Sequence, residues 1–429
     1  MHFFQESLAP SPYGNVQDIV TQNFIENNVV SFCVHFFQES LAPSPYGNVQ
    51  DIVTQNFIEN NVVSFCVLFL FPKKKDGGVM EFEKIVEPLL RWYEKNARQL
   101  PWRDDPTPYR VWISEIMLQQ TRVEAVKPYF ERFVRELPNV KALAEVPDEK
   151  LLKLWEGLGY YSRARSLKKA AILLMERFGG ELPTDVEQLR KLPGIGDYTA
   201  GSIASIAFGL PEPAVDGNVL RVAARLQNSR EDITQPAVKK ELRERLKKVY
   251  PKEQASAFTQ SLMELGATVC LPNGEPLCGE CPLAELCEAH RAGTQNELPV
   301  KAAKPKRRVE NRTVFLILSN GTAALRRRPE TGLLAGMWEF PCQKGTLTPE
   351  QVEKTLAEWG IKAETIEPLP AAKHIFSHVE WHMTGYLVKA EKPVLGFVWA
   401  SPEEVLGDYP VPSAYRAYLK ILRHLAGEK

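Results

Sequence analysis

The sequence predicts a multi-domain protein in which an all-α domain is followed by an α+β domain. The chain has 429 residues, which at about 150 residues per domain corresponds to two or three domains. From residue 81 to about 287 the apolar residues recur with the period of a helix, and from Thr313 the period shortens to that of strands. Hydrophobic residues are 44% and charged residues 25% of the chain, which excludes a collagen, a coiled-coil rod, a disulfide scaffold or wholesale disorder.

Charge is balanced over the whole chain but not along it. Basic and acidic residues number 53 each, so the net charge is zero. A zero net charge does not exclude a nucleic-acid ligand, because binding depends on where the charges lie. Residues 291–312 are polar, contain proline and carry seven Lys or Arg against two Glu. We expect this segment to be a basic interdomain linker or a strap that contacts phosphates.

The first 79 residues form a leader of unusual sequence. Residues 2–34 recur without a difference at 35–67. A solenoid needs about three repeats and its repeats normally diverge, so we expect a recent duplication or a gene-model artefact, with an ordered extra domain as the alternative. The apolar run 62–71 spans about half a bilayer and follows no basic segment, so it predicts neither a membrane span nor a signal peptide. We expect the functional protein to begin near Met80.

The helical domain is expected to span residues 80–290. Ile85, Leu89 and Trp92 fall on one helix face, and a second amphipathic stretch follows around residues 151–155. Segments 199–208 and 255–269 repeat the helical pattern, and Gly or Pro separates the segments from one another. These breaks predict several helices rather than one long rod.

The second domain is expected at residues 313–429. A helix is expected at 349–359 and another from about Pro412. Ser401 to Glu404 (SPEE) is a capping box with proline at the first helical position, which marks the start of a further helix. Apolar and alternating runs predict strands at 314–319, 323–328, 373–388 and 395–400.

Four of the seven cysteines are concentrated in an 18-residue segment with the spacing C-x7-C-x2-C-x5-C. Structural zinc usually takes two close pairs, and only one such pair is present here. Disulfides suit a secreted protein, and no secretory signal is visible. The uneven spacing around one loop favours four thiolates on a [4Fe–4S] cluster, with zinc, free thiols or disulfides as alternatives. The four residues are Cys270, Cys278, Cys281 and Cys287.

A glycine-containing turn, LPGIG at 192–196, lies between two helical stretches. Gly194 and Gly196 allow a tight turn whose backbone N–H groups approach a phosphate closely, as in a helix–hairpin–helix that grips a DNA backbone. The motif alone is weak evidence, but Asp216 follows 18 residues after Tyr198. A carboxylate beside such a hairpin is what a base-excision glycosylase needs. The alternative for Asp216 is a helix N-cap, which aspartate fills well.

A second carboxylate, Glu115, lies among apolar residues in WISEIMLQQT at 112–121. Burial there would raise its pKa and keep it protonated near neutral pH. A neutral carboxylic acid can donate a proton to a leaving base. On helical spacing alone, the alternative is a glutamate on the surface.

These motifs together resemble a known family. Residues 80–290 resemble the helix–hairpin–helix DNA glycosylases with an iron–sulfur loop, and residues 313–429 resemble the Nudix-related C-terminal domain of the adenine DNA glycosylase (MutY) family. The resemblance covers about 350 residues. It departs from the family at the leader and at residues 271–277, seven residues where the family usually has six between the first two cysteines. The motifs that carry it are LPWR (100–103), SEIMLQQTRV (114–123), WEGLGYYSRAR (155–165), LPGIGDYTAG (192–201) and VDGNVLR (215–221).

The resemblance implies a specific reaction. The family removes adenine mispaired with 8-oxoguanine or guanine, after the base is extruded from the duplex. By motif match Glu115 protonates N7 of adenine, and Asp216 stabilises the oxocarbenium-like sugar or bonds to it, as the two carboxylates of a glycosidase do. Tyr198 and Asn218 match positions that support the cation and place the sugar.

The resemblance also implies the binding residues, cofactor and partner. Gln120 and Tyr160 match residues that wedge into the base stack, and Gly194 and Gly196 belong to the DNA-binding hairpin. The cofactor is a [4Fe–4S] cluster, and the partner is double-stranded DNA with adenine opposite 8-oxoguanine or guanine. We expect a monomer in the bacterial cytoplasm, associated with the nucleoid and not with a membrane. The expected adenine pocket is Arg98, Leu118 and Gln260, and the expected 8-oxoguanine loop is Phe376, Ser377 and His378.

Three rival functions are weighed against this one. Endonuclease III-like enzymes excise oxidised pyrimidines and nick the strand with a lysine at the position of Tyr198, which forms a Schiff base. No lysine follows the hairpin here. An active Nudix pyrophosphatase needs a glutamate-rich helix for Mg²⁺, and most of these ligands are absent around residues 353–358. A non-catalytic DNA-binding protein would not need Glu115 and Asp216 together.

Overall fold

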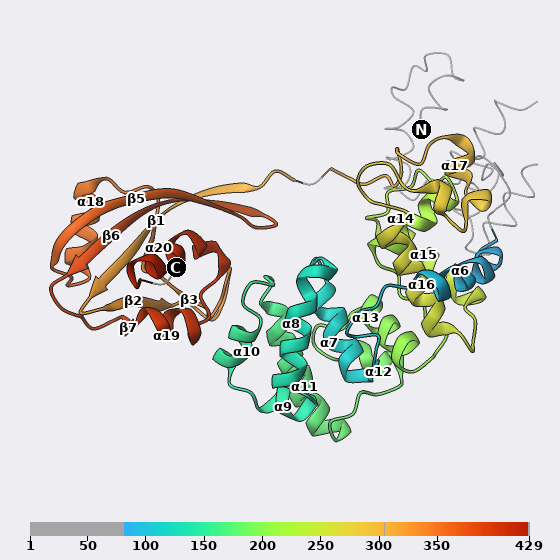
Figure 1. Cartoon of the computed structure of the whole chain (residues 1–429), viewed down its shortest axis with the longest axis horizontal. Helices are drawn as coiled ribbons and strands as arrows, with labels where there is room; N and C mark the ends of the chain where they lie inside the picture. The colour runs from blue at the N-terminus through green and yellow to red at the C-terminus, as the bar shows by residue number, and fades with distance from the viewer. Residues whose placement is uncertain (1–80, 304, 428–429) are drawn as a thin grey trace, which may run out of the picture. The chain divides into compact units, whose positions relative to one another are not determined.

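The computed structural model describes residues 81–303 and 305–427 (Figure 1). The leader expected at 1–79 lies outside the described residues, so the interpretation of it stays a prediction. In the part of the chain that is described, no helix is long and apolar enough to cross a membrane. The fold class predicted from the sequence is confirmed, with a helical domain followed by a domain built on a mixed sheet.

The helical domain consists of α-helices joined by short loops, as the periodicity predicts. Local capping explains several of the ends: Thr107 accepts the N–H of Arg110 at the start of α7, and Gly179 ends α11 in the left-handed conformation. The helices are α6 (Glu83–Asn96), α7 (Pro108–Leu118), α8 (Val123–Glu136), α9 (Val140–Glu145), α10 (Asp148–Leu154), α11 (Ser162–Phe178), α12 (Val186–Arg190), α13 (Asp197–Ser202), α14 (Gly217–Leu226), α15 (Pro236–Val249), α16 (Ala255–Thr268) and α17 (Glu288–Ala292).

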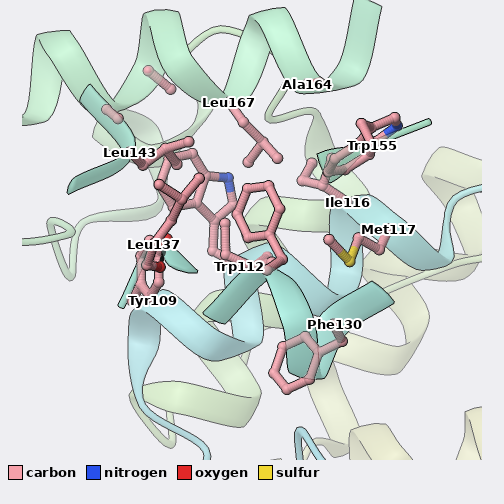
Figure 2. Packing of buried hydrophobic residues seen from close by; sticks show 14 of the residues in the cluster. Tyr109, Trp112, Ile116, Met117, Phe130, Leu137, Leu143, Trp155, Ala164 and Leu167 are labelled. Atoms are coloured by element: carbon pink, nitrogen blue, oxygen red, sulfur yellow. Dashed lines mark hydrogen bonds between the residues drawn. The ribbon is translucent and has the colours of Figure 1, made fainter. Parts of the chain in front are cut away.

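The helical domain has two hydrophobic cores. The first is formed by the helices from α7 through α13. At its centre are Trp112, Phe130 and Trp155, whose side chains are fully buried and surrounded by aliphatic residues (Figure 2). The second joins α6 to α14, α15 and α16, with Ile85 and Phe258 fully buried. Each such side chain stabilises the fold by about 1.5–3 kcal/mol. The two cores meet where the turn at Ile203–Ala207, which also contacts α7 and α13, packs against α16, and this junction positions the candidate site.

The helix predicted at 199–208 is present, but its second half is a π-helical turn and not an α-helix. The α-helix α13 ends at Ser202, and a π-helical turn follows at Ile203–Ala207. A tertiary contact accompanies this change. The backbone of Gly201 lies so close to the segment before Asp216 that an added Cβ would be 2.4 Å from the carbonyl oxygen of Pro213. Nothing in the local sequence pattern encodes that contact.

The C-terminal domain is built on a mixed sheet with the strand order β3-β2-β1-β6-β5, in which β4 also pairs with β1 and β7 with β2. β1 and β6 are parallel along their length, from Arg308 opposite Val379 to Leu318 opposite Lys389, and the other pairs are antiparallel. The strands are β1 (Arg308–Ser319), β2 (Thr322–Arg327), β3 (Trp338–Glu339), β4 (Cys342–Lys344), β5 (Ala363–Ile375), β6 (Val379–Ala390) and β7 (Val398–Ala400).

Helices cover both faces of this sheet. Phe315 and Ile317 of β1 pack on one face with α18 (Pro349–Glu358), and Val314 and Leu316 pack on the other with α20 (Arg416–Leu425). Successive side chains of a strand point to opposite faces, so the continuous apolar run of β1 reflects burial on both sides. The capping box predicted at Ser401 is confirmed, and it starts α19 (Pro402–Gly407).

Several strand predictions need correction. The run at 373–388 is two strands, the end of β5 and most of β6, with a turn at 376–378 between them. The strands β3 and β4 were not predicted, because two- or three-residue strands carry no period. The first ten residues of β5 were not predicted either. The basic segment expected at 291–312 ends earlier, since β1 already begins at Arg308, where its N–H donates to the carbonyl oxygen of His378.

Candidate active site

Glu115 lies in the second half of α7 and is buried, with 5% of its surface exposed. The surface position weighed above is therefore wrong. The hydroxyl of Tyr198, from α13, donates a hydrogen bond to its Oε2 atom. Burial raises the pKa of Glu115, more than the hydrogen bond from Tyr198 lowers it. The group is suited to carry a proton that an exposed glutamate would have lost.

Asp216 caps α14, which was the alternative interpretation of this residue, and it also faces the same cavity as Glu115. Its Oδ1 accepts the N–H of Val219 at 2.8 Å, and its Oδ2 accepts the side-chain amide of Asn218 at 2.7 Å. Burial raises the pKa of Asp216, while these donors stabilise its carboxylate form. Asp216 thus accepts two N–H donors, one from the backbone of Val219 and one from the side chain of Asn218, and both favour its carboxylate form.

The two carboxyl groups line one cavity of about 170 Å³ between the two helical cores. Close backbone packing brings α16 to its wall, since a Cβ on Gly266 would lie 2.6 Å from Cβ of Asn218. The structure brings together every residue that the sequence analysis assigned to catalysis or to the adenine pocket. These lining residues are Arg98, Glu115, Leu118, Tyr198, Asp216, Asn218 and Gln260.

Two further charged residues that line the cavity, Arg103 and Glu264, were not assigned a role by the sequence analysis. Glu264, which is 1% exposed, accepts hydrogen bonds from Nε of Arg98 at 2.6 Å and from Nη2 of Arg103 at 2.9 Å. Burial raises the pKa of Glu264, but the hydrogen bonds and charges of the two arginines outweigh it and hold the pKa below its usual value. The only sequence signal is that Glu264 lies four residues after Gln260, on the same face of α16.

The hairpin glycines adopt the geometry that the motif requires. Gly194 has φ +81°, and a Cβ there would lie 2.7 Å from Cβ of Ser166. Gly196 is the N-cap residue of α13, with an extended backbone and no side-chain cap. The turn therefore leads directly into the helix that carries Tyr198, so it connects the glycine hairpin to the cavity.

The two predicted wedge residues share an uncommon backbone conformation. Gln120 follows α7 with φ +57°, and Tyr160 precedes α11 with φ +46°. Both side chains are exposed. Left-handed backbone is rare outside glycine and, where it occurs, often marks a functional position.

The four cysteines of the predicted cluster line one small cavity of about 30 Å³ at the edge of the second helical core. Burial raises the pKa of the Cys281 thiol to about 12, so a bound cation would have to displace its proton. No three Cys, His, Asp or Glu side chains within residues 81–303 and 305–427 are arranged as ligands of a single metal ion. A cubane differs from such a site because each thiolate binds a different iron atom. The donor set fits a [4Fe–4S] cluster.

The predicted lesion loop is the turn between β5 and β6. Phe376 closes it with a backbone hydrogen bond from its N–H to the carbonyl oxygen of Val379, 2.9 Å, and its ring packs edge-on against Trp381. Ser377 Oγ and His378 Nδ1 are 3.1 Å apart at the exposed tip. The loop backbone is also held by Arg307, whose Nε donates to the carbonyl oxygen of Phe376 at 3.1 Å. The three side chains are thus presented on a fixed turn.

The helix α18, where a pyrophosphatase would hold Mg²⁺, offers no such site. Glu353 is exposed, and Glu358 lies 4.0 Å from Lys354 in an exposed pair. No group of three possible ligands exists there or elsewhere in the described part of the chain.

Comparison with known proteins gives the family. Residues 113–248 match the HhH-GPD superfamily of base excision DNA repair proteins, and residues 313–420 match the NUDIX domain. The adenine DNA glycosylase of Mus musculus is 35% identical over 352 residues, covering 68% of this chain and 68% of that protein. The Homo sapiens adenine DNA glycosylase is 33% identical over 417 residues (82% and 76% covered), and that of Buchnera aphidicola subsp. Baizongia pistaciae (strain Bp) is 34% identical over 297 (69% and 83%). The chain therefore belongs to the adenine DNA glycosylase family and is a DNA glycosylase of base excision repair.

Proposed function

We propose that this protein excises adenine paired with 8-oxoguanine or guanine in double-stranded DNA, without cleaving the strand itself. The observation that carries the proposal is the cavity in which Glu115 and Asp216 face one space with Tyr198 bonded to the acid. The base would enter this cavity after extrusion from the duplex. The helical domain performs the chemistry, and the Nudix-like domain reads the base opposite the adenine.

In this proposal Glu115 protonates N7 of the extruded adenine. Its raised pKa keeps the proton available near neutral pH, and general acid catalysis of this kind typically contributes 10²–10⁴-fold. Tyr198 holds the carboxyl group through its hydroxyl, so the acid cannot rotate away from the base. Protonation makes adenine a better leaving group.

Asp216 stabilises the positive charge that develops on the sugar as the bond to adenine breaks. Its carboxylate is held by Val219 and Asn218, so it does not have to reorganise during the reaction. Asn218 is held in turn by Nη2 of Arg221 at 2.9 Å. The geometry supports either electrostatic stabilisation or a transient bond to the sugar.

The pocket walls are proposed to hold the adenine ring. Leu118 supplies an apolar wall, while Arg98 and Gln260 supply donors and acceptors for the base edge. Arg98 is oriented by Glu264 through a bidentate contact, with its Nη2 donating to Oε2 at 3.0 Å as well. A pocket that hydrogen-bonds the purine edge excludes bases that lack the matching groups.

We also propose that the four cysteines hold a [4Fe–4S] cluster. When bound, the cluster supplies cross-links that order the loop at 270–287, which has only short helical turns of its own. The chain places a cation beside the donor set, because Nη1 of Arg225 donates to Sγ of Cys270 at 3.2 Å. Replacing Cys281 by serine should remove the brown colour of the protein and weaken DNA binding. A colourless protein that contains one zinc would contradict the assignment.

The test of the function is strand cleavage on three labelled duplexes, with and without alkali. They carry adenine opposite 8-oxoguanine, adenine opposite guanine, and thymine glycol opposite adenine. We expect base release from the first two and strand cleavage only after alkali. Preferred release of thymine glycol, with cleavage in the absence of alkali, would instead indicate an endonuclease III-like lyase.

A further inference from the structure

The two loops that carry Gln120 and Tyr160 pose a physical problem. A non-glycine residue in the left-handed region is strained, so the conformation persists only where the surroundings fix it. The Gln120 side chain is exposed and the Tyr160 side chain is 42% exposed. Side-chain packing is therefore incomplete at both positions. Contacts to the loop backbone help to fix the two conformations.

The guanidinium of Arg163, in the first turn of α11, bonds the first of these loops. Its Nη1 atom donates to the carbonyl oxygens of Ile116, Met117 and Gln119 at 2.7, 2.9 and 2.7 Å. The last carbonyl groups of a helix have no partner within it, and a cation is favoured at that end by the helix dipole. Arg163 thus fixes the point at which the chain leaves α7 toward Gln120.

The same guanidinium bonds the second loop. Its Nη2 atom donates to the carbonyl oxygens of Leu158 and Gly159, each at 3.2 Å, and to Oγ1 of Thr121 at 3.3 Å. Tyr160 follows directly, and its ring centroid lies 5.6 Å from Cζ of Arg163. One side chain therefore bonds the backbone next to both left-handed residues, although they are 40 positions apart in the sequence.

Burying the charged side chain of Arg163 at this position carries a large desolvation cost. The residue is 9% exposed, and within residues 81–303 and 305–427 no carboxylate neutralises it. Burial lowers its pKa to about 10, so it remains charged at neutral pH. Removing an ion from water costs several kcal/mol, which the carbonyl dipoles must offset. A neutral cap on α7 would avoid this cost, but it could not bond both loops.

We propose that Arg163 is the positioning residue for duplex opening. It holds the two loops as one unit, so that Gln120 and Tyr160 enter the base stack together as the adenine leaves it. The inference rests on the proposed function, because it requires these two side chains to be the ones that enter the duplex. It adds a residue that touches neither the base nor the sugar and acts through the loops.

The first test is Arg163→Lys, which keeps the charge but has one nitrogen in place of a fork. The readout of extrusion is 2-aminopurine placed beside the target adenine, which brightens when it unstacks. We expect most of the fluorescence rise to be lost and single-turnover excision to slow at least about tenfold, because small misplacements cost up to about 100-fold. Duplex affinity and the pH profile should stay close to wild type. Arg132→Lys is the matched control, since Nη2 of Arg132 donates to one backbone carbonyl, that of Leu154.

A double-mutant cycle with Tyr160→Ala separates positioning from a general structural role. If Arg163 acts through the two loops, the loss of extrusion caused by Arg163→Lys should be smaller once the Tyr160 ring is gone, because only the loop of Gln120 is then left to misplace. Additive losses would overturn the proposal. They would mean that the arginine affects excision independently of the wedge.

Gly159→Ala provides a route that leaves the buried cation in place, should Arg163→Lys fold poorly. Gly159 has φ +72°, and no atom lies within 4 Å of the position that a Cβ would take, so alanine strains the loop without a clash. We expect the same loss of extrusion with retained duplex affinity. Wild-type protein that does not excise adenine opposite 8-oxoguanine would refute the proposed function. Wild-type excision together with normal extrusion in Gly159→Ala and Arg163→Lys would refute this inference alone.

Discussion

Both domains bury a glutamate against a tyrosine hydroxyl. In the helical domain Tyr198 donates to Glu115, which is 5% exposed, and in the C-terminal domain Tyr415 donates to Glu339, which is 3% exposed, at 2.6 Å. By burial and by this hydrogen bond the two carboxyl groups are alike. They differ in their other neighbours, and this difference supports the proposal that Glu115, and not Glu339, donates a proton.

Glu339 is compensated by two cations. Arg326 donates to its Oε1 at 3.1 Å, and Arg328 bonds its Oε2. Within the described residues no arginine or lysine donates to Glu115, and desolvation therefore dominates its pKa. Arginine partners stabilise the charge of a buried carboxylate, whereas desolvation without such a partner favours the protonated form. Burial alone does not make an acid catalyst.

The largest expected effect tests the acid directly. Glu115→Gln keeps the shape of the side chain but has no proton to give, so single-turnover adenine excision should fall by about 10²–10⁴-fold or more. Duplex affinity should survive. Glu339→Gln is the matched control in the other domain, and it should lower the unfolding temperature while leaving excision by the folded fraction nearly unchanged. Near wild-type rates for Glu115→Gln would show that another group supplies the proton.

The pH dependence of adenine excision tests whether Glu115 acts in its protonated form. Excision should decline as pH rises through the raised pKa of Glu115, because the protonated form is needed, and it should decline at low pH as Asp216 becomes protonated. In Glu115→Gln the decline at high pH should disappear from the residual rate. An unchanged alkaline limb in that variant would assign the limb to a different group.

The free energy of unfolding should also depend on the protonation of Glu115. The folded-state pKa of Glu115 lies above its unfolded value, so the contribution of this group to stability is fully present below the unfolded pKa. It is lost as pH rises toward the folded pKa, because the folded state must then bury a charge. Urea unfolding of wild type and Glu115→Gln across this range should show the variant to be less pH-dependent. Parallel curves would contradict the shift.

Glu264 is the intermediate case, because it shares the cavity with Glu115 but has arginine partners. Glu264→Gln should leave the acid intact and loosen Arg98 and Arg103, so KM should rise more than kcat falls. We expect about a tenfold loss in kcat/KM, since a hydrogen bond to a charged group is worth about 1.5–3 kcal/mol and glutamine keeps part of it. Glu156→Gln, which loses a bridge to Lys153 outside the cavity, is the control. A loss confined to kcat would mean that Glu264 takes part in the chemistry.

These residues also show what the sequence could and could not predict. Glu115 and Asp216 were assigned because each lies in a motif that resembles the adenine DNA glycosylase family. Local sequence alone left a surface position open for Glu115 and a helix N-cap for Asp216. Glu264 was missed because its partner Arg98 is 166 residues away, and no local pattern encodes that pairing. Arg163 lies inside a recognised motif, but its bonds to two loops become visible only in three dimensions.

The fold also has parts that the sequence predicts and parts that it does not. The long amphipathic helices and the buried run of β1 were predictable, because burial on a repeating face leaves a period in the sequence. The strands β3 and β4 and the π-helical turn after Ser202 were not, since they depend on pairing and on the approach of Gly201 to Pro213. Local periodicity reports which face is buried and not which partner buries it.

The smallest expected effect concerns the exposed turn between β5 and β6 of the C-terminal domain, where we propose that 8-oxoguanine is recognised. Unlike the proposed chemistry at Glu115, this recognition does not depend on a buried carboxyl group. The tip residues Ser377 and His378 are held 3.1 Å apart on a turn whose base is fixed by Phe376. 8-Oxoguanine differs from guanine by an N7–H donor and an O8 acceptor, and a serine hydroxyl can serve either. A specific base contact is worth about 1–3 kcal/mol, but neighbouring groups share this one. Ser377→Ala should therefore reduce the preference for adenine opposite 8-oxoguanine over adenine opposite guanine only a few-fold.

Single-turnover rates on the two duplexes measure this ratio. The control is Ser319→Ala, since Ser319 is buried at the far end of β1. Equal slowing on both duplexes would place the serine in general DNA binding, and lesion reading would then have to lie elsewhere in the chain.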